Sequence, residues 1–126
     1  MNVVDSCGWL EYFANETNAD FFAPVIQDEE RLLVPSICLY EVYKKLHQQF
    51  GKREALEAIG RLYRGSIVEL SDEIALSAAQ LSIQHRLPMA DSIILATAQS
   101  HIATLWTQDE HFKDMEGVKY IEKKYK

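Results

Sequence analysis

Short apolar runs alternate along the chain with longer segments in which apolar residues recur every three or four positions. The short runs have the length and composition of buried strands, and the longer segments have the period of amphipathic helices. Strands that alternate with helices are typical of a parallel sheet covered on both faces. The pattern therefore predicts an α/β fold with a mostly parallel central sheet. The expected strands cover residues 1–4, 31–34, 67–70, 104–107 and 118–121.

Polar and helix-breaking residues set the ends of the predicted helices. Ser36 is the expected N-cap of the third helix, and Ser71 with Asp72 is expected to cap the fifth. Pro24 is tolerable only in the first turn of the second helix. One helix is predicted directly after Asp5 and Ser6, and a helical turn over 109–114. The other predicted helices cover residues 20–30, 36–49, 52–64, 72–85 and 90–101.

Length and composition are those of an ordinary globular protein. A chain of 126 residues with 48% hydrophobic residues is expected to form a single domain over residues 1–126. No apolar run approaches the ~20 residues that cross a bilayer, and no segment resembles a signal peptide, so a cytoplasmic location is expected. Cys7 and Cys38 lack a metal-type spacing and are expected to be reduced packing thiols.

The formal net charge of −6 argues against broad binding of nucleic acid through bulk electrostatics. A local basic cluster is still present, and it forms either a solvated helix face or a set of phosphate contacts beside an acidic site. Its members that are candidates for substrate binding are Lys44, Lys45, Lys52 and Arg53. A second group of basic residues lies at the C-terminus, and these residues are expected to belong to a solvated tail. It consists of Lys119, Lys123, Lys124 and Lys126.

Four acidic residues stand beside apolar segments. Asp5 and Asp109 follow predicted strands, while Glu41 and Asp91 lie in predicted helices. In open α/β sheets, ligands bind beyond the carboxyl ends of the strands, which is where Asp5 and Asp109 fall. Burying an isolated carboxylate costs several kcal/mol, so these acids need a compensating cation. Four hard oxygen donors at one edge of a sheet suit Mg²⁺ or Mn²⁺.

Each of these acids also has a simpler explanation when it is taken alone. Asp5 and Asp109 could cap helices, and Asp91 could face the positive end of a helix dipole. Glu41 is harder to explain, because it lies in an apolar helix. The simple explanations weaken when the four are taken together, since one sheet would bring their separate segments to the same edge.

Two hydroxyl residues support the acidic set. Ser6 and Thr107 lie one or two positions from an acid, where each hydroxyl could bond a carboxylate from an outer shell. Among the four histidines, His111 is the best candidate for a role because it lies two residues beyond Asp109. The aromatic residues between positions 9 and 22 are expected to form a protein–protein surface.

Four blocks of sequence together resemble PIN-domain proteins, in particular the VapC-type toxins of bacterial and archaeal toxin–antitoxin pairs. The resemblance covers essentially the whole chain, in order, with no acidic position missing. Each block alone is weak evidence for the family. The resemblance depends on all four blocks occurring in this order. The blocks are VVDS at 3–6, PSICLYEV at 35–42, LPMADSIILATA at 87–98 and TQDEHF at 107–112.

The resemblance implies a three-layer α/β/α sandwich whose acidic rim binds Mg²⁺ or Mn²⁺ and cleaves RNA. Its implied partners are an RNA substrate, a cognate antitoxin in an apolar groove and a second copy in a homodimer. Ser6 and Thr107 would be the supporting hydroxyls. The implied catalytic and metal-binding quartet is Asp5, Glu41, Asp91 and Asp109.

Other functions remain open at this point. A catalytically silent PIN-like binding module would use the same fold, but it has no reason to keep four charges in mutual repulsion. A DNA-directed nuclease is a further alternative, because the quartet does not distinguish RNA from DNA. A receiver-type phosphoacceptor domain would need paired acids after the first strand, whereas Asp5 is followed by Ser6 and Cys7.

Overall fold

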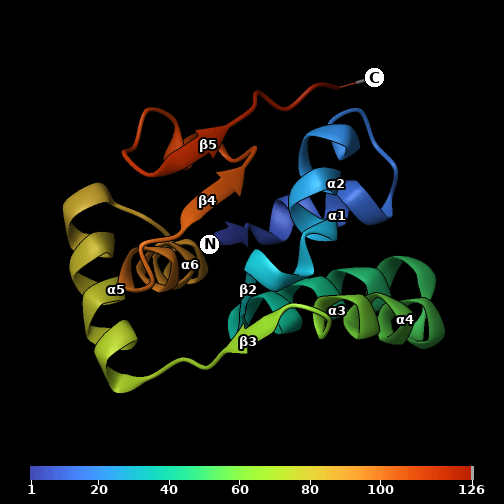
Figure 1. The fold of residues 1–126 in the computed structure, drawn as a ribbon, viewed down its shortest axis with the longest axis horizontal. Helices are drawn as coiled ribbons and strands as arrows, with labels where there is room; N and C mark the ends of the chain where they lie inside the picture. The colour runs from blue at the N-terminus through green and yellow to red at the C-terminus, as the bar shows by residue number, and fades with distance from the viewer. Residues whose placement is uncertain (126) are drawn as a thin grey trace.

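Five short strands form the centre of the molecule, in the order β3-β2-β1-β4-β5 (Figure 1). The computed structural model describes residues 1–125, so Lys126 lies outside the described part. All four pairings between neighbouring strands are parallel, which confirms the predicted sheet. The strands are β1 (Asn2–Val4), β2 (Leu32–Pro35), β3 (Ser66–Val68), β4 (Thr104–Thr107) and β5 (Val118–Tyr120).

Helices cover both faces of the sheet, as predicted. Figure 1 shows α5 and α6 on one face and α1 to α4 on the other, which makes three layers. None of the helices within residues 1–125 is long and apolar enough to span a bilayer. The helices are α1 (Ser6–Phe13), α2 (Ala19–Gln27), α3 (Ser36–Phe50), α4 (Lys52–Leu62), α5 (Asp72–His85) and α6 (Met89–Ser100), with short 3-10 turns η1 (Glu29–Arg31) and η2 (Glu110–Phe112).

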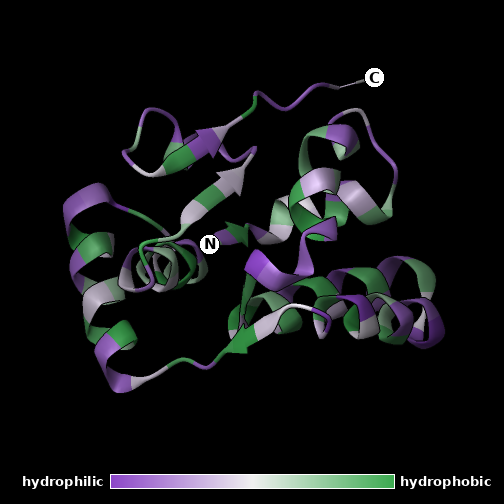
Figure 2. Ribbon diagram, viewed as in Figure 1, coloured by the Kyte–Doolittle hydropathy of each residue, from purple (hydrophilic) through white to green (hydrophobic). Residues whose placement is uncertain are grey.

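The core lies between the sheet and the two helical layers. Val3, Val4, Val34 and Leu105 are completely buried, because the strands are covered on both sides. Figure 2 shows the corresponding concentration of hydrophobic residues in the central strands. In α6, every residue from 92 to 98 is buried. This helix packs against both the sheet and α5, which explains why its sequence is apolar on all sides.

Some local predictions were wrong. Pro35 rather than Ser36 precedes α3, and no side chain caps that helix. Ser71 does cap α5, since its Oγ accepts a hydrogen bond from the backbone N–H of Ile74 at 3.1 Å. The aromatic residues Trp9 and Phe22 were expected at an interface but are completely buried in the core.

The second helix also differs from its prediction. Pro24 lies in the interior of α2 instead of its first turn, and the helix ends at Gln27. A proline there removes one hydrogen bond of the helix. Because Phe22, Val25 and Ile26 are buried on the same helix, tertiary packing holds it in place despite that loss. Helix propensity is a weak guide where packing of this kind decides the outcome.

Gly8 brings α1 close to α2 and the sheet. A Cβ atom at Gly8 would lie 2.6 Å from Cε1 of Phe22 and 2.8 Å from Cγ1 of Val4, so an alanine cannot fit without movement. We expect Gly8→Ala to destabilise the protein by about 1–3 kcal/mol, because overpacking outweighs the gain in helix propensity. Urea denaturation measures this change.

Gly60 provides the matched control for this substitution. It lies in α4, and a Cβ atom there would meet nothing within 4 Å. Gly60→Ala should therefore stabilise the protein by about 1 kcal/mol. A stabilising effect of Gly8→Ala would contradict the close packing of α1 on Phe22.

Candidate metal centre

Asp5 is a buried carboxylate at the carboxyl end of β1, only 3% exposed. The register of β1 with β4 pairs Val4 with Trp106, so the residues that follow each strand lie side by side. Thr107 Oγ1 donates a hydrogen bond to Asp5 Oδ2 at 2.7 Å, and Cys7 Sγ donates to the same oxygen at 3.3 Å. Asp5 precedes α1 without capping it through its side chain, so capping does not explain this carboxylate.

Asp91 and Asp109 meet at a histidine. His111 Nδ1 lies 3.0 Å from Asp91 Oδ2 and 3.2 Å from Asp109 Oδ1. Asp91 is in the first turn of α6, and Asp109 follows β4, where it also accepts the backbone N–H of His111 at 3.0 Å. One ligand atom from each of the three side chains lies within 4.8 Å of the others. The imidazole thus lies where a cation between the two carboxylates would be stabilised.

Glu41 lies beside this group on α3. Ser6 Oγ donates a hydrogen bond to Glu41 Oε1 at 2.7 Å. The negative charge of Glu41 contributes to raising the pKa of Asp91, so the two carboxylates are near each other. Glu41 and Asp5 are nevertheless not in the tight group that Asp91, Asp109 and His111 form.

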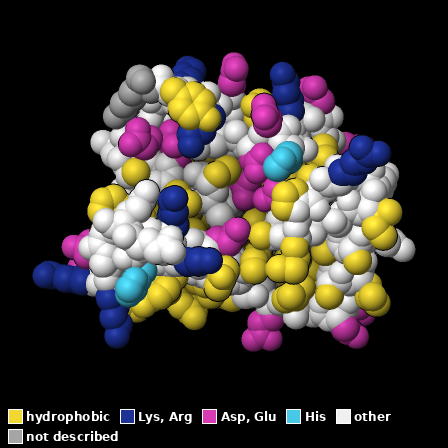
Figure 3. All heavy atoms as spheres, turned by 180° about the vertical axis from the view of Figure 1, so that it is seen from behind, with side chains coloured by type: hydrophobic (Ala, Val, Ile, Leu, Met, Phe, Trp, Pro, Cys, Tyr) yellow, Lys and Arg dark blue, Asp and Glu magenta, His cyan; other side chains and the backbone are white. Residues whose placement is uncertain are grey.

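Burial and mutual repulsion disfavour the negative charges of the site. Burial, with the charges of Asp91 and Asp109, raises the pKa of Asp5 to about 7, although the hydrogen bonds from Thr107 and Cys7 oppose the rise. Burial and the Asp109 charge likewise raise the pKa of Asp91. The hydrogen bond to Asp91 raises the pKa of His111. Burial is thus the main reason that the charged forms of Asp5 and Asp91 are disfavoured, and the repulsion between the acids adds to it. Figure 3 shows acidic side chains gathered beside a histidine near the middle of one face.

Thr107 connects two of the acids. Its Oγ1 donates to Asp5 and accepts the backbone N–H of Asp109 at 2.9 Å. The hydroxyls expected to support the acids, Ser6 and Thr107, therefore both contact acidic residues of the set. The assignment of the four carboxylates as metal ligands stays a prediction.

A buried polar network supports the loop that carries Asp109, and the sequence did not reveal it. Glu11 is 5% exposed, and its two carboxylate oxygens accept hydrogen bonds from Gln108 Nε2 at 3.1 Å and from the backbone N–H of Asn18 at 2.9 Å. Asn18 Nδ2 donates to Gln108 Oε1 at 3.0 Å. A glutamate inside an apolar helix was the available signal. This satisfied network ties α1 to the end of β4.

Cys7 was also missed as part of the site. Its sulfur lies 3.5 Å from Thr107 Oγ1 as well as close to Asp5. Burial raises the pKa of this thiol well above its usual range, so the thiol stays neutral at the carboxylate. Its contact with Thr107 could not be read from sequence because it depends on the pairing of β1 with β4.

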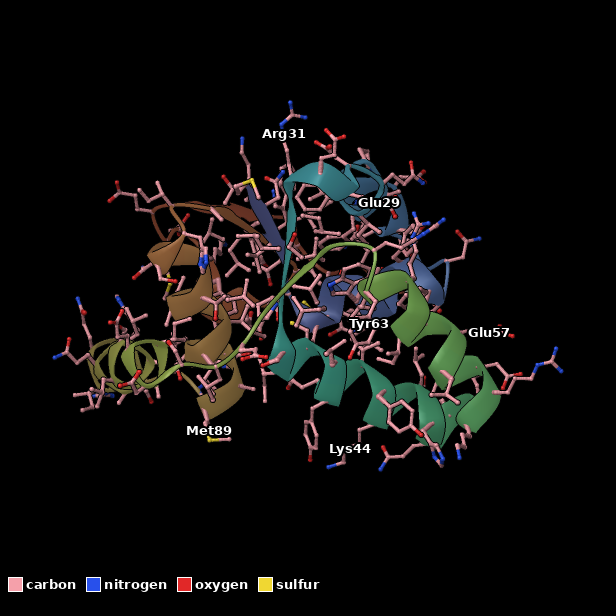
Figure 4. All side chains as sticks on the ribbon, turned by 60° about the horizontal axis from the view of Figure 1, so that its bottom comes forward. Glu29, Arg31, Lys44, Glu57, Tyr63 and Met89 are labelled. Carbon is pink, nitrogen blue, oxygen red and sulfur yellow. The ribbon has the colours of Figure 1, made fainter. Side chains whose placement is uncertain are left out.

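The four basic residues that are candidates for substrate binding lie in different surroundings. Lys45 lines a cavity of about 780 Å³ that also contains Cys7. Lys44 instead contacts Tyr40 in α3, and Figure 4 shows its side chain projecting away from the molecule. Arg53 is 87% exposed and pairs with Glu57 at 3.5 Å. Lys52 begins α4 and is exposed. Their role in binding phosphates stays a prediction.

A parallel α/β sandwich with carboxylates at the carboxyl edge of its sheet defines the class of this protein. The PIN domain family model matches residues 3–118, and the chain belongs to that family. Comparison with curated protein sequences found no match.

Solved structures of toxin–antitoxin proteins have a similar fold. A toxin–antitoxin complex from Klebsiella pneumoniae superposes with a TM-score of 0.77 at 23% identity, covering 94% of this chain and 95% of that one. VapC20 of Mycobacterium tuberculosis is a toxin that cleaves the sarcin–ricin loop. It superposes with a TM-score of 0.78 at 13% identity, covering 92% of this chain and 95% of that one. DNA-bound VapBC from Salmonella typhimurium gives 0.75 at 16% identity, covering 96% of each chain.

Proposed function

We propose that this protein is a metal-dependent endoribonuclease and the toxin of a toxin–antitoxin pair. The observation that carries the proposal is the convergence of Asp5, Asp91 and Asp109 from three separate segments, with a histidine bridging two of them. A bound cation would offset the repulsion between these carboxylates. Membership of the PIN domain family and the likeness to toxin–antitoxin structures support the same function.

The donor set fits Mg²⁺ or Mn²⁺. Asp5, Glu41, Asp91 and Asp109 offer hard oxygen atoms, which both ions prefer. Both hydrogen bonds that Asp5 accepts within residues 1–125 go to Oδ2, which leaves Oδ1 for a ligand. When bound, such an ion activates a water molecule and neutralises charge on the scissile phosphate.

The residues around the acids hold them in place for this chemistry. Thr107 fixes the orientation of Asp5 while binding the backbone of Asp109, and Ser6 fixes Glu41. His111 is half exposed and its Nδ1 contacts both Asp91 and Asp109, so a bound cation would compete with it for these two carboxylates.

The partners we propose are an RNA substrate, a cognate antitoxin protein and a second copy of the chain, with action in the cytoplasm. The toxin–antitoxin complexes among the similar structures support an antitoxin partner. Leu76 and Ile83 on α5 support a protein contact, because they are 71% and 82% exposed and lie seven positions apart on one helix face.

Growth arrest tests the proposal directly. Expression of the protein alone is expected to arrest growth and to cleave cellular RNA, whereas Glu41→Gln should do neither, because one carboxylate of the site is lost. Glu69→Gln is the matched control, since Glu69 is exposed in the loop after β3. RNA from induced cultures, analysed for new 5′ ends, measures cleavage.

Identical growth of cultures that express the wild type and Glu41→Gln would contradict a toxic nuclease and favour a silent binding module. Purified protein should also be incubated with single-stranded RNA and DNA of the same sequence in Mn²⁺. Cleavage of DNA alone would replace the proposed substrate with DNA.

A further inference from the structure

The chain after β5 does not leave the molecule as a free tail. Ile121 donates its backbone N–H to the Thr107 carbonyl at 3.0 Å, and Asn18 Nδ2 donates to the Glu122 carbonyl at 3.0 Å. Figure 1 shows this segment running from β5 toward α1 and α2. Residues 121–125, called here the C-terminal tail, are therefore anchored at their first two residues beside Thr107 and Gln108, directly before Asp109. Residues 122–125 are exposed, as expected for a solvated tail, although the backbone is anchored at Ile121 and Glu122.

Two adjoining cavities lie along the tail. The larger has a volume of about 780 Å³ and the smaller about 420 Å³, both within the usual range of ligand sites. The smaller cavity contains Asp109 together with Tyr120. Through Asp109, one wall of this cavity belongs to the candidate metal centre. The residues that line both cavities are Cys7, Gln108, Lys123 and Tyr125.

The side chains of the tail combine a positive charge with an aromatic ring. Lys123 Nζ lies 5.6 Å from the centre of the Tyr125 ring, and Tyr125 is 84% exposed. Proteins that bind single-stranded nucleic acid use this combination, in which lysine or arginine follows the phosphates and bases stack on aromatic rings. The protein carries a net charge of −6, so an RNA chain needs local cations to approach the acids.

The lining of the smaller cavity favours RNA over a peptide partner. An apolar peptide anchor requires an apolar pocket, whereas this cavity is lined mainly by polar and charged residues. Its carboxylates Glu110 and Glu122 can accept hydrogen bonds from ribose hydroxyls and base amino groups.

We propose that the C-terminal tail forms a binding subsite for single-stranded RNA next to the metal centre. Tyr125, together with Tyr120, stacks on a base beside the scissile phosphate, and Lys123 neutralises a neighbouring phosphate. The inference rests on the proposed nuclease function and adds the position at which the substrate is held. Asn18 is a positioning residue for this subsite, because its amide fixes the backbone at Glu122.

Two matched pairs of variants test the subsite. Lys123→Ser is compared with Lys119→Ser. Lys119 is a suitable control because successive strand residues point to opposite faces of the sheet, so Lys119 points away from the face on which Tyr120 lines the smaller cavity. Tyr125→Ala is compared with Tyr63→Ala, because Tyr63 is an exposed tyrosine (61%) at the end of α4, labelled in Figure 4. The affinity for a fluorescent single-stranded RNA is measured at several salt concentrations, with Ca²⁺ in place of Mg²⁺ to suppress turnover.

We expect Tyr125→Ala to weaken RNA binding by about five- to a hundred-fold, and Tyr125→Trp to restore it. Lys123→Ser should reduce the slope of log affinity against log salt by about 0.7, the value for one phosphate contact on a single strand. Lys119→Ser and Tyr63→Ala should behave as the wild type. Melting curves in Mn²⁺ should be unchanged in all five variants, since the carboxylates are intact.

Wild-type affinity and salt slope in both Lys123→Ser and Tyr125→Ala would overturn the subsite, even if the wild type cleaves RNA in Mn²⁺. Equal losses in the matched controls would overturn it as well, because the effect would not depend on the tail. Failure of the nuclease proposal is a different result, in which the wild type binds the RNA but leaves it intact with every divalent ion.

Discussion

Asp91→Asn is expected to abolish RNA cleavage while the protein stays folded. Asp91 lies with Asp109 at the centre of the ligand group, so its loss should weaken Mn²⁺ binding by more than the about 10- to 100-fold typical of an outer-shell partner. The melting temperature without metal should be equal or higher, because one of several repelling charges is gone. Melting curves with and without Mn²⁺, beside a cleavage assay on total RNA, measure both effects.

Asp72→Asn is the matched control, since Asp72 and Asp91 both lie in the first turn of a helix. Each substitution removes a favourable interaction with a helix dipole, about 0.3–1 kcal/mol. Only Asp91→Asn should lose the stabilisation by Mn²⁺. Full cleavage activity in Asp91→Asn would exclude Asp91 from the metal centre.

Asp5→Asn is expected to stabilise the metal-free protein, and the gain should increase with pH. The pKa of Asp5 is about 7 in the folded protein against 3.8 for an ordinary aspartate. Between these values the folded state holds a proton that the unfolded state has lost, so deprotonation on raising the pH destabilises the wild type. Between pH 5 and pH 8 the wild type should lose about 2–3 kcal/mol relative to Asp5→Asn.

Urea denaturation of both proteins at pH 5, 6, 7 and 8, in the presence of a chelator, measures this difference. Adding Mn²⁺ should reverse the order at pH 8, because the ion stabilises the ionised wild type and not the variant. The stabilisation by Mn²⁺ should also shrink as the pH falls, since protons compete for the same carboxylates. A difference in stability that is constant from pH 5 to pH 8 would contradict a raised pKa of Asp5.

The overall fold was predictable because its signals are local and repeated. Short apolar strands alternate with longer amphipathic segments, and four parallel pairings follow from that alternation. The carboxyl-edge rule then placed Asp5 and Asp109 at one rim. Helix ends were less predictable where packing decides them. Pro24 stays inside α2 because its neighbours Phe22, Val25 and Ile26 are buried.

Contacts between distant segments were beyond sequence reasoning. The bridge from His111 to Asp91 and Asp109 depends on how α6 meets the loop after β4. The network around Glu11 joins residues nearly a hundred positions apart, as in the bond from Gln108 to Glu11. A single sequence shows which residue types are present, whereas the hydrogen bonds of these residues depend on the finished topology.

The central place of β1 also has a consequence during protein synthesis. Asn2 pairs with Thr104, so the first strand to leave the ribosome lacks its neighbour on one side until β4 is made. At about 5–20 residues per second, that delay lasts about 5–20 s. Asp109 follows β4, so the group of candidate metal ligands lacks this carboxylate until residue 109 has been added. The candidate metal centre is therefore complete only after most of the chain has been synthesised.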